Sequence, residues 1–149
     1  MLSVKNERKK MKRKFKAAEM RTVLFVDYDE IILHSLERDL MDESYNKLFA
    51  NSCKEALEIL QREQVHVIVT EMSLPEMSGL EFLRAARKEH PDIVGIVLSG
   101  YEHDAALQRA VDQGEIFKLV PKPWKLGVVD FEFIIRQAVD HSHLQTIHG

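Results

Sequence analysis

Polar side chains that can bind a metal ion or an anion stand at the ends of four short apolar segments of this sequence. Carboxylate oxygens are preferred ligands of Mg²⁺, and a hydroxyl and an ammonium group can hold the oxygens of a bound anion. The residues are Asp27, Tyr28 and Asp29 after the first of these segments, and Glu71, Ser99 and Lys122 after the other three. If the fold brings the segment ends together, these residues form one site.

The order of apolar segments predicts an α/β domain. Short segments rich in Val and Ile are expected to form strands at residues 22–26, 47–50, 65–70, 93–99 and 116–120. Apolar side chains recur at helical spacing after each strand. Parallel strands need such crossovers, so we expect a doubly wound, five-stranded parallel sheet with helices on both faces. Ligands of these sheets bind beyond the carboxyl ends of the strands, where the six polar residues stand.

Local signals indicate where several helices begin and end. Asn51 or Ser52 can cap the second helix, with Glu55 placed to complete a capping box. Pro91 is expected to end the third helix, and Gly114 stands where a left-handed residue would follow the fourth.

Composition indicates one soluble, cytoplasmic domain. The chain has 149 residues, 45% of them hydrophobic and 30% charged. No apolar run is long enough to span a membrane. The single cysteine, Cys53, cannot form an internal disulfide and is spaced as a core residue.

Basic residues are concentrated at the N-terminus. Residues 1–21 hold nine of the 21 Lys and Arg residues but only two of the 24 Asp and Glu residues. We therefore expect a basic, flexible arm (1–21), a folded domain (22–141) and a C-terminal tail (142–149). The arm is either a solvated leader or a segment that binds nucleic acid or anionic lipid. The acidic remainder of the chain argues against nucleic-acid binding by the domain itself.

Four sequence segments resemble the receiver domain of two-component response regulators. They are VLFVDYDE, VTEMSLPEMSGLEFL, IVLSG and VPKPW, and the resemblance covers residues 22–141. It implies a flavodoxin-like fold with strand order 2-1-3-4-5 and a role in phosphorelay signalling rather than an enzyme activity of its own. Implied partners are a sensor histidine kinase, a phosphorelay protein or a second receiver.

The resemblance also assigns roles to individual residues. Glu71 stands at the phosphoacceptor position, beside an acidic pocket formed by Asp27, Tyr28 and Asp29. Ser99 and Lys122 are the implied phosphate contacts, and Leu119 occupies the position of a switching aromatic residue. The implied ligands of Mg²⁺ are Asp27, Glu71 and the main-chain carbonyl of Ser73, and the Lys122–Pro123 bond is expected to be cis.

Two substitutions depart from the receiver pattern. Glu71 replaces the aspartate that would accept the phosphoryl group, and Tyr28 replaces a carboxylate that would bind the metal ion. Mg²⁺ tolerates little change in ligand geometry, so its binding should be weakened. We expect a degenerate receiver in which Glu71 takes no phosphoryl group and pairs with Lys122.

Two alternatives remain open from the sequence. The segment FVDYDEII also resembles the first motif of haloacid-dehalogenase-type phosphatases, with Asp27 as nucleophile and Asp29 as acid and base. The other alternative is an interaction module without site chemistry, in which Lys122→Ala would leave partner binding unchanged.

Overall fold

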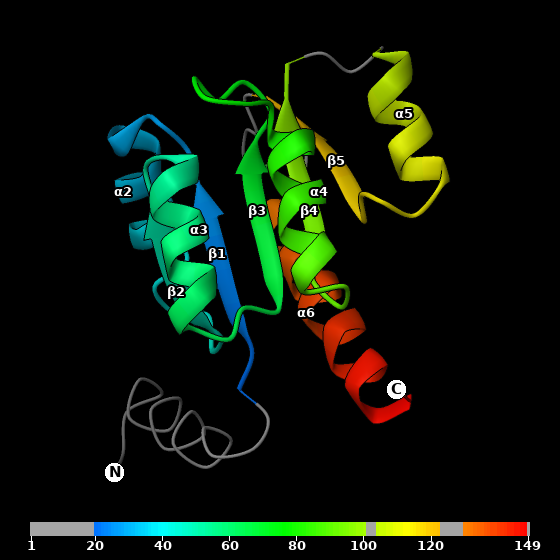
Figure 1. The fold of residues 1–149 in the computed structure, drawn as a ribbon. Coiled ribbons are helices and arrows are strands. Elements are labelled where there is room, and N and C mark those ends of the chain that lie inside the picture. The colour runs from blue at the N-terminus through cyan, green and yellow to red at the C-terminus, as the bar shows by residue number, and fades with distance from the viewer. Residues whose placement is uncertain (1–19, 101–103, 123–129, 149) are drawn as a thin grey trace, which may run out of the picture.

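The computed structural model describes residues 20–100, 104–122 and 130–148 and contains one five-stranded sheet. The strands are β1 (Thr22–Val26), β2 (Asn46–Ala50), β3 (Val67–Glu71), β4 (Val94–Ser99) and β5 (Lys118–Pro121). The helices are α2 (Glu30–Asp39), α3 (Cys53–Arg62), α4 (Gly79–Glu89), α5 (Ala105–Asp112) and α6 (Phe131–His148). All pairings are parallel and the order is β2-β1-β3-β4-β5, which confirms the predicted doubly wound fold (Figure 1).

Helices cover both faces of the sheet. Side chains of α3, α4 and α5 pack with one face, and those of α2 and α6 pack with the other. Alternate residues of β1 divide between the two cores, with Leu24 and Val26 on one side and Val23 and Phe25 on the other. Burial on both faces explains why the strands read as continuous apolar segments.

The predicted helix boundaries follow from local hydrogen bonds. Ser52 Oγ accepts a hydrogen bond from the backbone N–H of Glu55 at 3.1 Å, so Ser52 is the cap of α3. Helix α4 ends at Glu89, two residues before Pro91. Gly114 has a φ of 79° after α5, as predicted for a left-handed residue.

The last strand begins later than its apolar pattern predicts. Ile116 is buried, but its N–H donates to the carbonyl of Ala110 in α5 rather than to the sheet. The pairing with β4 begins at Lys118, which is in register with Ile96. Apolar residues can therefore be buried at a strand end without being part of the strand.

Helix α6 continues through residues that the sequence assigned to a C-terminal tail. It extends to His148, and Ser142 within this part is only 4% exposed. A guanidinium nitrogen of Arg21, just before β1, lies 3.1 Å from His143 Nδ1. These contacts attach the end of α6 to the start of the sheet. Within the described residues, no helix is both long and apolar enough to cross a membrane.

Candidate functional site at the carboxyl ends of the strands

The carboxyl ends of β1, β3, β4 and β5 bring Asp27, Glu71, Ser99 and Lys122 to one edge of the sheet. Asp27 follows β1 directly, while Glu71 and Ser99 are the last residues of β3 and β4. Lys122 follows β5, and its N–H donates to the carbonyl of Ser99 at 3.0 Å. The predicted convergence of these residues is therefore observed.

Asp27 is held in place by the backbone around it. Its side chain is buried, and Oδ1 accepts a hydrogen bond from the N–H of Asp29 at 2.9 Å. Its own N–H donates to the carbonyl of Ala50 at the end of β2, at 3.2 Å. These bonds leave Oδ2 directed toward Lys122.

Glu71 is fixed by the loop between β3 and α4. Its Oε1 accepts a hydrogen bond from the N–H of Ser73 at 3.0 Å, and Ser73 forms an isolated bridge with Ser78. Gly79, which begins α4, donates its N–H to the carbonyl of Met72 at 2.7 Å. A Cβ atom at Gly79 would lie 2.2 Å from the carbonyl oxygen of Glu71, so only glycine fits there without a shift of the backbone.

Lys122 supplies the positive charge between the two buried carboxylates. Its Nζ lies 3.1 Å from Asp27 Oδ2 and also contacts Glu71 Oε2, which confirms the expected pairing of Glu71 with Lys122. Burial alone would lower the pKa of Lys122, but hydrogen bonds to Glu71 and Asp27 outweigh it and raise the pKa. The lysine is therefore cationic at neutral pH and neutralises part of the charge of both acids.

Three other predicted residues lie beside this cluster without joining its ion pairs. Tyr28 is 55% exposed. Asp29 caps α2, because its Oδ1 accepts a hydrogen bond from the N–H of Ile31 at 2.9 Å. Leu119 is half-buried in β5 and pairs in register with Val97. The predicted cis bond involves Pro123, which is outside the described residues.

Sequence reasoning missed a contact that supports the loop after β3. Glu76 Oε2 accepts a hydrogen bond from the N–H of Cys53 at 2.8 Å, so the loop caps the start of α3. Nothing local predicts a bond between residues so far apart. The cap of α4 did have a local signal: Ser78 and Glu81 have the spacing of a capping box, and Ser78 Oγ accepts from the N–H of Glu81.

Comparison with known proteins decides the family. Residues 23–130 match the response regulator receiver domain. The chain belongs to this family. The match favours the receiver interpretation over the phosphatase alternative, and the receiver has the expected fold. Receiver domains interact with sensor kinases and with the output domains of response regulators, and they typically bind Mg²⁺ at the acidic pocket.

Curated relatives of this receiver are much longer proteins. It is 36% identical over 125 residues to the hydrogenase transcriptional regulatory protein HoxA of Cupriavidus necator, covering 83% of this chain and 25% of that protein. It is 37% identical over 107 residues to the sensor kinase CckA of Brucella abortus, covering 70% of this chain and 11% of that protein. The chain thus spans a quarter or less of these two relatives.

Solved structures share the fold over most of this receiver. The adenylate cyclase structure from Rhodopirellula baltica has a TM-score of 0.79 and 27% identity, covering 87% of this chain and 94% of that one. A CheY-like receiver domain from Methanospirillum hungatei has a TM-score of 0.74 and 25% identity, covering 85% and 98%.

The acidic pocket of this receiver differs from the expected set of Mg²⁺ ligands at residue 28. Asp27 and Glu71 share the ammonium group of Lys122, and residue 28 supplies a phenol instead of a carboxylate. Within the described residues, no group of three or more His, Cys, Asp and Glu side chains is arranged to hold a metal ion.

Proposed function

We propose that this receiver is a degenerate signalling module that acts without phosphorylation at residue 71. The observation that carries the proposal is the position of Lys122 Nζ, which contacts both Asp27 and Glu71. In this arrangement the charge of Glu71 lies beside the lysine that would otherwise hold a phosphoryl group. The carboxylate brings one negative charge, compared with about −1.5 to −2 for a phosphate, and is therefore a partial substitute.

The length of the glutamate side chain works against phosphoryl transfer. It has one more methylene group than aspartate, which moves the carboxylate by about 1.5 Å, one C–C bond. In-line attack on phosphorus depends on position, and a misplacement of about 1 Å can cost roughly a hundredfold in rate. The hydrogen bond from the N–H of Ser73 also holds Glu71 Oε1 in its present position.

Weak binding of Mg²⁺ is the second part of the proposal. Asp27, Glu71 and the carbonyl of Ser73 would be the ligands if the ion binds, and it would neutralise charge on a phosphoryl group. Because Lys122 already offsets part of the charge of the two acids, an added Mg²⁺ ion gains less from binding them.

The proposed partners are a sensor histidine kinase, a phosphorelay protein or a second copy of this receiver, in the cytoplasm. Such a partner would recognise the surface of the domain rather than a change in its phosphorylation. The alternative without site chemistry differs in one respect: Lys122→Ala would then leave partner binding unchanged.

Labelling with a small acyl phosphate in the presence of Mg²⁺ tests the proposal. We expect no stoichiometric labelling of the wild-type chain and measurable labelling of Glu71→Asp/Tyr28→Asp, with Glu71→Asp alone in between. Magnesium affinity should rise in the same order. Stoichiometric phosphate mapped to Glu71 in the wild type would refute the proposal, whereas an unlabelled double variant would favour the module without site chemistry.

A further inference from the structure

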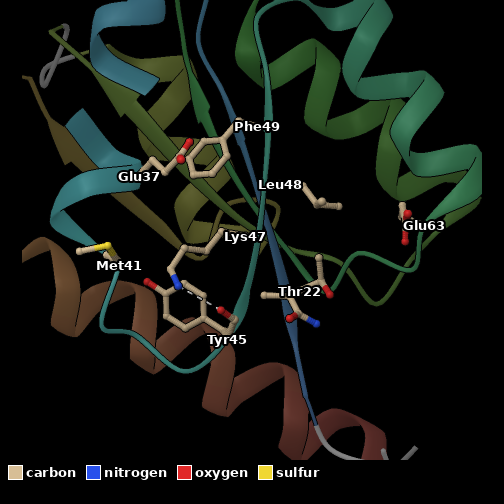
Figure 2. A pocket seen from close by; sticks show the side chains of 9 residues that line it. Thr22, Glu37, Met41, Tyr45, Lys47, Leu48, Phe49 and Glu63 are labelled. Atoms are coloured by element: carbon tan, nitrogen blue, oxygen red, sulfur yellow. Dashed lines mark hydrogen bonds between the residues drawn. The ribbon is translucent and has the colours of Figure 1, made fainter. Parts of the chain in front are cut away.

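A groove runs along β2, the outermost strand on one side of the sheet. It has a volume of about 560 Å³ and is open to solvent at the edge of the sheet (Figure 2). Glu37 of α2 and Met41 in the turn after α2 line one side together with Phe49 of β2, and Glu63 at the end of α3 lines the other. We call this surface the β2 groove.

Two carboxylates in the β2 groove have no ion pair with the part of the chain that the structure describes. Neither the Glu37 nor the Glu63 side chain forms an ion pair or hydrogen bond with any described residue. The lysine in the groove, Lys47, donates from Nζ to the carbonyls of Glu43 and Tyr45 at 2.8 and 3.2 Å. It also lies 5.0 Å from the centre of the Tyr45 ring. The groove is therefore open to a positively charged segment.

The surroundings of the groove strengthen its negative charge. Residues 30–63, which include α2, β2 and α3, hold eight Asp and Glu residues but only four Lys and Arg residues. Met41 is 67% exposed beside Glu37, and Phe49 is half-buried. Acidic groups next to exposed apolar surface suit lysine and arginine side chains, whose aliphatic stems can pack while their charged ends pair.

The N-terminal arm has the charge that this groove requires. Residues 1–19 hold eight Lys and Arg residues and two Glu residues. The arm leads into Thr22, which lines the β2 groove and is in register with Asn46 at the start of β2. An extended chain covers about 3.3 Å per residue, so the basic residues between 5 and 16 can reach the whole groove.

We propose that the basic arm of this chain docks in its own β2 groove. Glu37 and Glu63 pair with arm cations, and the tether raises the effective concentration of the arm so that weak contacts suffice. The docking covers the edge of β2 and holds the arm away from polyanions until salt or a competing polyanion releases it. This inference needs no phosphoryl chemistry, so its failure would leave the function proposed above unaffected, and the reverse also holds.

Paramagnetic broadening in the full chain tests the docking. A nitroxide on Asn6→Cys reports on the arm, and Cys53 stays unlabelled because only 2% of it is exposed. We expect stronger broadening of amides in β2 than in β5, which lies at the opposite edge of the sheet, about 19 Å away at four strand spacings. High salt should reduce the difference to the part that the attachment of the arm at Thr22 alone produces, because charge interactions are screened within about 3 Å at 1 M.

A charge-matched pair of variants separates docking from general attraction. Glu37→Gln/Glu63→Gln should lower the docking equilibrium constant about fivefold, as expected for the loss of two exposed ion pairs. Glu81→Gln/Asp112→Asn changes the net charge equally on α4 and α5 and should leave the broadening in place.

Three results would overturn the proposal. One is equal broadening at β2 and β5, and another is the same loss of broadening in both double variants. The third is broadening of isotope-labelled chains by separate, spin-labelled chains, which would place the arm on a second molecule instead of in its own groove.

Discussion

Replacing Lys122 with methionine removes the cation that contacts both Asp27 and Glu71. The two carboxylates are only 2% and 6% exposed, so they would be left buried without a counter-ion. Breaking a buried ion pair costs about 3–5 kcal/mol. Because the lysine side chain is 21% exposed and water can enter, we expect a loss near the lower limit, about 3 kcal/mol of unfolding free energy.

Urea unfolding followed by circular dichroism measures this loss. Lys122→Met/Glu71→Gln should recover a large part of it, because glutamine keeps the shape of Glu71 without its charge. The matched control is Arg84→Met, which removes an exposed ion pair with Glu115 at 2.6 Å and should cost less than about 1 kcal/mol.

Stabilisation by Mg²⁺ gives a second test of the prediction that Lys122 is the counter-ion of Asp27 and Glu71. In Lys122→Met the ion can take the place of the lost ammonium group, and a concentration 100 times its Kd would stabilise the variant by about 2.7 kcal/mol. The wild-type chain should gain much less at the same concentration. Equal stabilisation of both proteins, or a loss in Lys122→Met no larger than in Arg84→Met, would show that Lys122 is not the counter-ion of this pocket.

Two further predictions concern residues away from the ion pairs. Burial and the nearby charge of Arg21 lower the pKa of His66 to about 4. As the pH falls, His66 is therefore protonated in the unfolded chain at a higher pH than in the folded chain. The unfolding free energy should therefore decrease between pH 6.5 and 4, by about 1–2 kcal/mol once solvent screening of the half-buried ring is allowed for. Urea titrations of His66→Asn should show a weaker pH dependence, and an equal one would contradict the assignment. Gly79→Ala places a Cβ 2.2 Å from a backbone oxygen and should cost about 1–3 kcal/mol in the same assay. Gly100→Ala, whose Cβ would have no described atom within 4 Å apart from its chain neighbours, should be neutral.

The fold could be predicted because its signals are local. Runs of Val and Ile mark the strands, and Ser52 and Gly114 mark helix boundaries through bonds to residues nearby in the chain. The convergence of Asp27, Glu71 and Lys122 followed from topology, because the carboxyl ends of parallel strands meet at one edge. No detail of packing was needed for either prediction.

What could not be predicted depends on packing between distant segments. The capping of Cys53 by Glu76 and the contact between Arg21 and His143 join residues that no periodic pattern relates. The contact of Lys122 with both Asp27 and Glu71 likewise depends on side-chain positions. The roles of Ser99, Leu119 and the other site residues stay predictions from the family resemblance.

The contact between Arg21 and His143 brings the entrance of β1 and the last turns of α6 to the same end of the sheet, opposite to Lys122. Fluorescent proteins or affinity tags joined beyond either position would therefore leave the acidic pocket accessible. A five-residue strand such as β1 separates the two ends by about 16 Å. A domain joined beyond the last turn of α6 would therefore be attached at the end of the sheet that lies away from the acidic pocket.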